Sequence, residues 1–226
     1  MYLKCLSLSI IVFLLSRPSF AQVSKATTAT NQISGEVQLL SQYVERGLNM
    51  SDGNPAMNAS FLYNLGSQVK MGFWGSNISN LSAVDDNFWF KLLAQFDVLF
   101  GSNLKSNIYF SDDHFYKSNQ RNGQKFGANF EYYTYVFGLE WMTNFEGTHS
   151  NAEYFNFGKY FYYNGSKMRY GAIAGYTLNT VRGISSYFDV KLLGQYMMNS
   201  TTSFEVGVSI NLNNTYFGKR GDPALY

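Results

Sequence analysis

The sequence is poor in cysteine and in charged side chains, and each scarcity narrows the class of protein. Its single cysteine, Cys5, lies at the extreme N-terminus, so we expect no disulfide and no cysteine-based metal site in the rest of the chain. Charged residues make up only 14% of the chain, against roughly 25% in ordinary soluble domains. Aromatic residues, by contrast, make up 18%. This balance predicts that something other than water surrounds part of the surface.

Long apolar runs are also missing, apart from one near the start. The run from Cys5 to Ser16 follows a short basic start and precedes Ser19-Phe20-Ala21, a small-x-small cleavage pattern, so residues 1–21 are predicted to be a signal peptide. A membrane anchor is the alternative, but the run is shorter than the ~20 residues that span a bilayer. Residues 22–32 are polar and rich in threonine, which predicts a flexible lead. Later stretches are too short for transmembrane helices.

A strong basic charge is absent as well. The chain has 17 basic and 15 acidic residues, and cleavage after Ala21 would remove Lys4 and Arg17 but no acid. The mature chain would then carry no net charge. Nucleic acid is therefore not an expected partner, because its binding depends on an excess of basic side chains.

Alternation of apolar with polar or small residues is the main pattern of the remaining chain. This period of two predicts β-strands with one apolar face. The expected strands span residues 33–43, 56–65, 69–76, 88–97, 104–110, 125–133, 137–144, 152–163, 167–176, 188–196 and 204–211. The facing of the stretch 152–163 stays open, because Lys159 lies among phenylalanines.

The connections between these strands alternate between tight turns and longer polar segments. A transmembrane β-barrel has this alternation, with short turns on the periplasmic side and longer loops outside. Residues 33–226 are therefore expected to form an antiparallel outer-membrane β-barrel of about twelve strands in a Gram-negative bacterium. Eleven strands are recognisable, and the last is expected to be short or missing, which would leave a seam beside the first. A secreted sandwich or a lipocalin-like barrel is the alternative.

The two faces of the predicted strands differ in chemistry. Apolar side chains, including Tyr43 and Phe73, fall on the outward face, and Trp74, Trp89 and Tyr133 on the inward one. Charges on a lipid-facing surface cost up to ~2–4 kcal/mol, which explains why they collect inside. The candidates for lining the lumen are Arg46, Lys70, Trp74, Lys91, Asp97, Lys105, Lys125, Glu131, Glu140, Lys167, Arg169, Asp189, Lys191 and Glu205, with Glu36 as a further inward acid.

Residues 43–77 carry a recognisable set of motifs. They are Tyr43, Arg46-Gly47, Ser51-Asp52-Gly53-Asn54-Pro55-Ala56 and Gly72-Phe73-Trp74-Gly75-Ser76-Asn77. This set resembles the TorF-like family of outer-membrane porins, and the resemblance implies a barrel with a pore. The chain departs from the family pattern at Asp85-Asp86-Asn87, where Glu-x-Asp is expected, and it lacks a final strand that ends on an aromatic residue.

Two functions follow from this prediction. The first is a porin that lets small hydrophilic solutes diffuse through a narrow lumen of mixed charge. The second is a closed structural or surface-binding barrel without a pore. Arg46 fits both, because it could attract anionic solutes or could pair with an inward acid such as Asp85 or Asp86 and hold the first loop. Outer-membrane lipid and the barrel-insertion machinery are the other expected partners.

Catalysis is not expected. His114 and His149 fall in predicted loops without a nucleophile motif, so a hydrolytic triad is not indicated. The cluster Asp112-Asp113-His114, in the predicted loop 111–124, could hold a cation, but a solvated loop is the simpler interpretation. The segment Asp52-Gly53-Asn54-Pro55 is ordinary turn chemistry. No cofactor and no metal are expected.

Overall fold

The computed structural model describes residues 33–79, 86–163, 167–179, 185–199, 201–212 and 224–225. The predicted signal peptide, the lead and Asp85 therefore lie outside the described residues. The described residues form antiparallel β-structure with two short 3-10 turns, which confirms the all-β prediction. Among them, no helix has the length and hydropathy needed to cross a bilayer.

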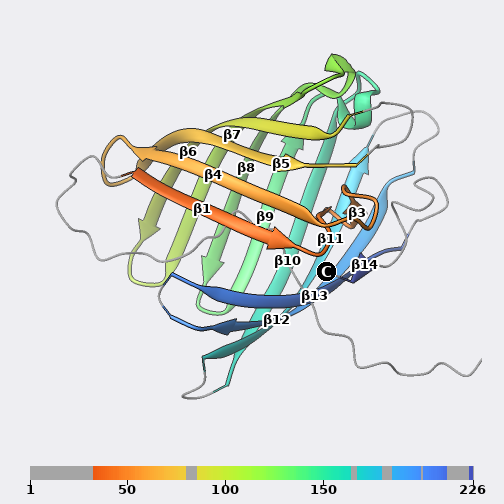
Figure 1. Ribbon diagram of the computed structural model, residues 1–226. Helices are drawn as coiled ribbons and strands as arrows, with labels where there is room; N and C mark the ends of the chain where they lie inside the picture. The colour runs from red at the N-terminus through yellow and green to blue at the C-terminus, as the bar shows by residue number, and fades with distance from the viewer. Residues whose placement is uncertain are drawn as a thin grey trace, which may run out of the picture.

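Each of the eleven predicted strands is present, and consecutive long strands pair antiparallel along the chain (Figure 1). The long strands are β1 (Ile33–Leu40), β4 (Ala56–Asn64), β5 (Val69–Asn77), β6 (Phe88–Phe100), β7 (Leu104–Phe115), β8 (Gly123–Tyr132), β9 (Tyr135–Met142), β10 (Ala152–Tyr162), β11 (Met168–Asn179), β12 (Tyr187–Met197) and β13 (Ser203–Asn211). The sheet curls around an interior, so that its concave face encloses a space.

The connections alternate in length as the sequence predicts. Short ones cover residues 65–68, 101–103, 133–134, 163–167 and 198–202, and longer ones cover 41–55, 78–87, 116–122, 143–151 and 180–186. Because the strands are antiparallel, all the short connections lie at one end of the sheet. The 3-10 turns η1 (Asn119–Arg121) and η2 (Phe145–Gly147) belong to the longer connections at the other end (Figure 1).

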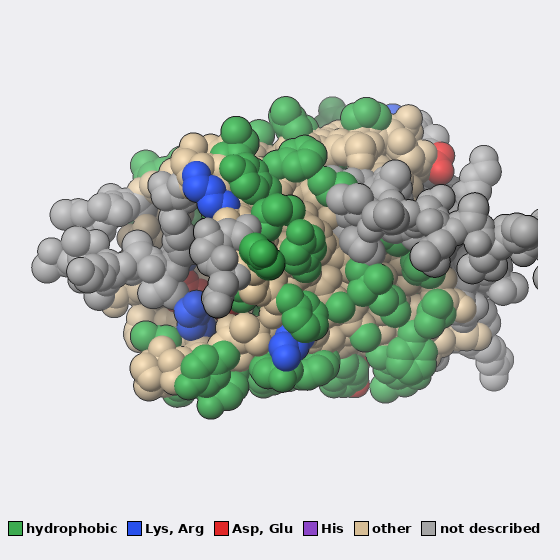
Figure 2. Space-filling model, turned by 90° about the horizontal axis from the view of Figure 1, so that it is seen from below, with side chains coloured by type: hydrophobic (Ala, Val, Ile, Leu, Met, Phe, Trp, Pro, Cys, Tyr) green, Lys and Arg blue, Asp and Glu red, His purple; other side chains and the backbone are tan. Residues whose placement is uncertain are grey.

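The two faces of the sheet follow the predicted alternation. Apolar side chains such as Leu39, Phe157 and Phe188 stand on the convex face with more than half of their surface exposed. Figure 2 shows apolar side chains spread over this outer surface with few charged ones between them. Most charged side chains of the long strands point to the concave face, whereas Asp112, His114, Glu153 and Lys159 stand on the convex one. The sequence left open which face of β10 carries Lys159. In the structure Lys159 points outward, like the phenylalanines beside it, and its Nζ lies 3.3 Å from the hydroxyl of Tyr135.

The sheet is not closed into a barrel. Its hydrogen-bonded order begins at β1 and ends at β14 (Ala224–Leu225), a two-residue strand that pairs with Val208 and Ser209 of β13. Within the described residues no ladder joins β1 to β13 or β14. A short last strand agrees with the sequence-based expectation.

A small hairpin departs from the predicted fold. The strands β2 (Val44–Glu45) and β3 (Leu48–Asn49) pair with each other and form a separate two-stranded sheet. The predicted first strand therefore ends at Leu40 instead of residue 43. Tyr43, predicted to face outward, is 3% exposed and packs inside the sheet, so that prediction is wrong. The chain turns inward after β1, and this takes Tyr43 off the outer face.

Two further predictions fail at strand ends. The polar stretch 111–124 was expected to be a loop, but β7 continues to Phe115 and β8 begins at Gly123. Tyr133, predicted to point inward, occupies a tight turn with a positive φ of 52° and is 61% exposed. Its hydroxyl accepts a hydrogen bond from Asn103 in the neighbouring turn.

Candidate functional site

The hairpin of β2 and β3 projects into the interior of the curled sheet. Glu45 pairs with Leu48, which leaves Arg46 and Gly47 as a two-residue turn. Their φ angles are 49° and 73°, and two positive angles in succession are what a type I′ turn requires. The sequence Arg46-Gly47 thus folds the chain sharply back on itself.

The tip of this hairpin touches the last strands of the sheet. A side-chain carbon added to Gly47 would press on Asp189 of β12 and would lie close to Asn211 of β13. Val44, at the base, is completely buried and shares a small apolar cluster with Ala224 of β14. The hairpin therefore reaches from β1, at one edge of the sheet, to β12, β13 and β14 at the other edge.

Aromatic packing holds the base of the hairpin. The ring of Tyr43 lies 5.6 Å from Trp74 on β5 and 6.1 Å from Trp89 on β6, measured between centroids. Trp89 stacks on Phe115 at 5.2 Å. The Tyr43 N–H donates to Ser51 Oγ at 2.9 Å, which fixes the return of the chain after β3. The sequence-based prediction that Trp74 and Trp89 point inward is confirmed by their packing against the hairpin.

An ion network joins the hairpin to the strands around it. Glu45 Oε1 lies 2.8 Å from Arg46 Nη1, 3.0 Å from Lys125 Nζ on β8 and 3.6 Å from Lys91 Nζ on β6. The other carboxylate oxygen of Glu45 accepts a hydrogen bond from the Tyr43 hydroxyl at 3.1 Å. Glu45 is therefore the centre of the network, although the sequence-based list of site residues omits it.

The same network reaches two more acids. Arg46 Nη1 lies 2.8 Å from Glu140 Oε1 on β9, and Glu140 accepts a second hydrogen bond from the hydroxyl of Tyr109 at 2.5 Å. Lys125 Nζ lies 2.9 Å from Asp113 Oδ2 on β7. Three basic and three acidic groups thus balance one another in a buried cluster. Because the charges compensate, the cluster anchors the hairpin more readily than it attracts an ion.

The partners of Arg46 differ from those that the sequence suggested. Its expected partner Asp86 instead accepts hydrogen bonds from the backbone N–H groups of Lys117 and Ser118, at 3.0 and 2.9 Å. Arg46 pairs with Glu45 and Glu140, so the suggested pairing with Asp86 is wrong, but the suggested role of Arg46 in holding the first loop agrees with the structure.

The Glu45 carboxyl remains ionised despite its burial. Burial by itself would raise the pKa of Glu45, but the neighbouring Arg46, Lys125 and Lys91 hold that pKa well below its usual value. Burial similarly tends to lower the pKa of Arg46, and Glu45 and Glu140 raise it well above the usual value. The charged forms of Glu45 and Arg46 are therefore stabilised by the partners that surround them when the hairpin is docked.

Acid is expected to release the hairpin. The folded-state pKa of Glu45 lies below its usual value of 4.5, so its contribution to docking is complete above pH 4.5 and is lost as the pH falls through the lowered pKa. A Leu48→Cys variant in a Cys5→Ser background places the only thiol on the buried hairpin. Its attack on a dipyridyl disulfide, a reagent that still reacts with thiols in acid and releases thiopyridone, should be slow at neutral pH and accelerate below pH 4.5.

A Ser102→Cys variant in the same background supplies the control, because Ser102 lies exposed in a turn. Dividing the two rates removes the pH dependence of the reagent. Unchanged protection of the Leu48→Cys thiol at a pH where circular dichroism shows an intact sheet would contradict a hairpin held by the Glu45 charge.

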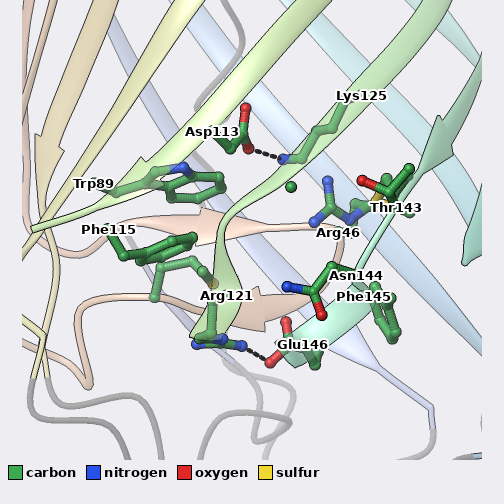
Figure 3. Close-up of a pocket in the computed structure, with 13 residues that line it drawn as sticks. Arg46, Trp89, Asp113, Phe115, Arg121, Lys125, Thr143, Asn144, Phe145 and Glu146 are labelled. Atoms are coloured by element: carbon green, nitrogen blue, oxygen red, sulfur yellow. Dashed lines mark ion pairs between the residues drawn. The ribbon is translucent and has the colours of Figure 1, made fainter. Parts of the chain in front are cut away.

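Two of the longer connections clamp together beside the hairpin (Figure 3). Arg121 of η1 forms an ion pair with Glu146 of η2, and the Asn144 amide donates to the backbone oxygens of Gln120 and Asn122, both at 2.7 Å. A small cavity of about 40 Å³ separates this clamp from the pair of Asp113 and Lys125. The interior is thus covered twice at this end, by the hairpin and by the clamp.

A larger cavity of about 160 Å³ lies on the other side of the hairpin. Trp74, Tyr109 and Tyr154 contribute aromatic surface to it, and Lys91 lies with its Nζ 4.4 Å from the Trp74 ring centroid. The carboxamides around it are Asn58, Gln95, Asn107, Asn129 and Asn156. The sequence-based list of site residues includes none of these carboxamides, since an inward asparagine has no motif of its own.

Ion pairs also occur nearer the short-turn end, but these are open to solvent. Lys70 Nζ lies 2.6 Å from Asp97 Oδ2, and Lys105 Nζ lies 3.4 Å from Glu131 Oε1. These side chains are 29–45% exposed, whereas those of Arg46 and Lys125 are 9% exposed. The interior therefore forms a vestibule that is accessible from the short-turn end and covered at the long-connection end.

The remaining predicted lumen residues do not join the network. The structure places them as follows: Lys167 Nζ donates to the Met198 backbone oxygen at an exposed turn, Arg169 lies over the Tyr160 ring, Asp189 accepts from Tyr154, Lys191 lines the larger cavity and Glu205 points inward on β13. No group of three histidine, cysteine or acidic side chains that could hold a metal occurs among the described residues.

The motif residues of the first turn stabilise the segment that leads out of the hairpin. Asp52 and Gly53 have positive φ angles of 51° and 79°. The Asn77 side chain accepts from the Met57 N–H at 2.6 Å and donates to the Pro55 oxygen at 3.0 Å, which ties this turn to the end of β5.

The remaining motif residues permit close approach between strands. A side-chain carbon on Gly72 would collide with the backbone of Phe61, and one on Gly75 would press on the ring of Phe88. Ser76 is buried and donates to the Asn77 backbone oxygen at 2.9 Å. The motif residues thus shape the hairpin and its supports.

Comparison with known proteins identifies a family without assigning an activity. Searches of curated proteins and of solved structures found no match. A family model described as a bacterial protein of unknown function (Gcw_chp) matches residues 24–215, which include the hairpin, the ion network and the larger cavity. The chain therefore belongs to the bacterial Gcw_chp family.

Proposed function

We propose that this protein is an outer-membrane β-barrel that lets small hydrophilic solutes pass through a narrow interior. The observation that carries the proposal is the contrast between the two faces of one curled sheet. Its convex face is apolar and aromatic, and its concave face carries ion pairs and carboxamides. In an outer membrane the apolar convex face would contact lipid, and the polar concave face would contact water.

The distribution of tyrosines supports a membrane location. Most of the exposed tyrosines lie near the short connections, and Tyr116 lies at the other end. Those near the short connections are Tyr132, Tyr133, Tyr135, Tyr162, Tyr163, Tyr170 and Tyr196. Outer-membrane barrels have girdles of aromatic residues where the apolar band meets the headgroups. Lys159, the outward lysine of β10, lies beside this band next to Tyr135, where its ammonium group can reach the headgroup layer.

A membrane barrel requires that its edge strands be paired or covered. Unpaired backbone N–H and C=O groups cost several kcal/mol each in hydrocarbon, and only closure or cover avoids that cost. The edge strands β1 and β13 lie on the same side of the molecule in Figure 1. Closure between these two edges, with β14 contributing to the seam, is therefore part of the proposal.

The interior supports weak selectivity among solutes. Arg46, Lys91 and Lys125 are balanced by Glu45, Asp113 and Glu140, so neither sign of charge prevails at the hairpin. The resemblance to TorF-like porins also points to a pore. Passage would require the hairpin to move or solutes to pass beside it, because it crosses the interior.

Planar-bilayer recording tests the proposal. The purified chain without residues 1–21 should insert with small stepwise conductances and should discriminate little between potassium and chloride. A heat-denatured sample of the same preparation serves as the control. Folded protein that inserts into the bilayer but shows no conductance, at neutral pH and at pH 4, would refute the pore.

A closed barrel is the second candidate, and the docked hairpin favours it. Together the hairpin and the Arg121–Glu146 clamp cover one end of the interior. Liposome swelling separates the two functions. Vesicles with the protein should swell in sugar or amino-acid solutions if solutes pass, and should behave like empty vesicles if the barrel is closed.

A further inference from the structure

A single row of polar positions crosses the concave face from β6 to β13. Each member lies directly opposite the next across the sheet: Asp97, Asn107, Asn129, Gly138, Asn156, Gly175, Asp189 and Asn211. Asp97 lies near the short-turn end of β6, whereas Asn211 is the last residue of β13 at the opposite end. The row therefore climbs from the open vestibule to the underside of the hairpin.

The glycines in the row make room for neighbouring polar groups. A side-chain carbon on Gly138 would lie 2.6 Å from both Asn129 Oδ1 and Asn156 Nδ2. The two amides thus converge over the same space from opposite sides. A side-chain carbon on Gly175 would likewise collide with the hydroxyl of Tyr154 and with Asp189 Oδ2.

Several hydrogen-bonding atoms around the larger cavity lack partners. Asn58 and Asn107 are 2% and 5% exposed, and the Oδ1 atom of each is buried without a hydrogen bond among the described residues. Arg46 Nε is likewise buried without a hydrogen bond among the described residues. Buried polar atoms of this kind are normally satisfied by protein, water or a ligand. The walls of the cavity therefore offer unused hydrogen-bonding capacity.

The chemistry of the cavity favours a neutral solute. The charged groups of the hairpin network around it pair with one another, and Lys191 interacts with Asp189. The other polar groups are mainly carboxamides, which both donate and accept. Hydroxyl groups also do both, so they match carboxamides without leaving a charge unpaired. Trp74 and Tyr43 add aromatic surface on which an apolar ring face can lie.

The size of the cavity sets a limit on the ligand. Its volume of about 160 Å³ compares with the ~150 Å³ of an engineered cavity that holds one benzene ring. One six-membered ring therefore fits, with substituents reaching into the vestibule. We propose that this cavity, with the amides of Asn107, Asn129 and Asn156, binds a small neutral polyhydroxylated solute of monosaccharide size. This inference rests on the proposed function, because it names the class of solute that would pass through the interior.

Tryptophan fluorescence tests this site in detergent-solubilised, folded protein. The chain has three tryptophans, of which Trp74 lines the cavity and Trp141 faces outward. Titration with glucose, galactose and mannose should give a saturable change for at least one sugar, whereas acetate, lysine and glutamate should not. The change should disappear in Trp74→Phe and persist in the matched variant Trp141→Phe.

Two interior variants sharpen the test. Gly138→Val should abolish binding because its side chain occupies the space between the amides of Asn129 and Asn156. Asn129→Ala should weaken binding about two- to tenfold, which is the effect of losing one neutral hydrogen bond. Asn103→Ala, an amide variant in the turn between β6 and β7, should leave affinity unchanged.

The titration of the unmodified protein decides the proposal even if a variant fails to fold. No saturable response to any of the sugars, or tighter binding of the charged solutes, would overturn it. Sugar binding without conductance would leave the site standing and remove the channel function. Conductance without sugar binding would do the reverse, so the two failures can be told apart.

Discussion

Replacing Glu45 with glutamine is expected to release the hairpin and to increase both solute flux and conductance. The variant keeps the shape of the side chain but removes the charge that Arg46, Lys91 and Lys125 share. Arg46 would keep Glu140, and Lys125 would keep Asp113, but Lys91 would lose the one carboxylate with which it forms an ion pair among the described residues. Removing one partner from a buried ion pair costs about 3–5 kcal/mol.

A penalty of that size corresponds to a shift of about 10²- to 10⁴-fold in the ratio of released to docked hairpin. Single-channel recording measures the result as larger or longer openings, and the Leu48→Cys thiol should become reactive at neutral pH. Glu131→Gln is the matched control, because Glu131 pairs with Lys105 in the vestibule away from the hairpin. Equal behaviour of the two variants would mean that the hairpin is not held by Glu45.

Replacing Phe157 with arginine is expected to prevent stable insertion into lipid. Phe157 stands in the middle of β10 on the convex face and is 60% exposed. An arginine on the lipid face at the bilayer midplane costs about 2–4 kcal/mol in an outer-membrane barrel. Urea titration of protein folded into lipid vesicles should show this loss, and the outer-membrane fraction of expressing cells should contain less of the variant.

Tyr133→Arg provides the control for depth. Tyr133 is as exposed as Phe157 but lies in a turn at the end of the sheet, where the same substitution costs only about 0–1 kcal/mol. If the convex face met water instead of lipid, Phe157→Arg would be harmless or would improve solubility. Equal stability of the two variants in vesicles would therefore argue against a lipid-facing surface.

The strands were predictable because each one carries its own signal. Alternation with a period of two fixes both the strand and its facing, as in the stretch Met57–Leu65. Lys159 shows the limit of that signal, since a long side chain can stand on the outward face beside Tyr135. The alternation of short and long connections is also present in the structure, and because the strands are antiparallel it places all the short connections at one end of the sheet.

The hairpin was not predicted because its strands are only two residues long. Tyr43 continues the alternation of the first strand, so the pattern extends past the point where the chain turns inward. The turn signal was present in Arg46-Gly47, whose second residue is glycine, but a type I′ turn says nothing about where a hairpin docks. That position depends on Glu140, which is 94 residues away from Arg46.

The row of polar positions on the concave face was not predicted for a related reason. Asn107, Asn129 and Asn156 are ordinary polar residues in their own strands, and only the register of the sheet aligns them. Asp113 was missed because it follows Asp112 in a polar stretch that resembles a loop. A sequence pattern assigns a face to each residue, whereas a site depends on which strands are neighbours and by how much they are offset.

The contacts of the hairpin also impose an order on folding. The hairpin follows the first strand, yet its tip rests against Asp189 and Asn211, which belong to strands near the end of the chain. Contacts between segments so far apart in sequence form late, because a long loop must close before they can form. We therefore expect the hairpin to dock only after the last strands have formed, which would make the docked hairpin a marker of a completed sheet.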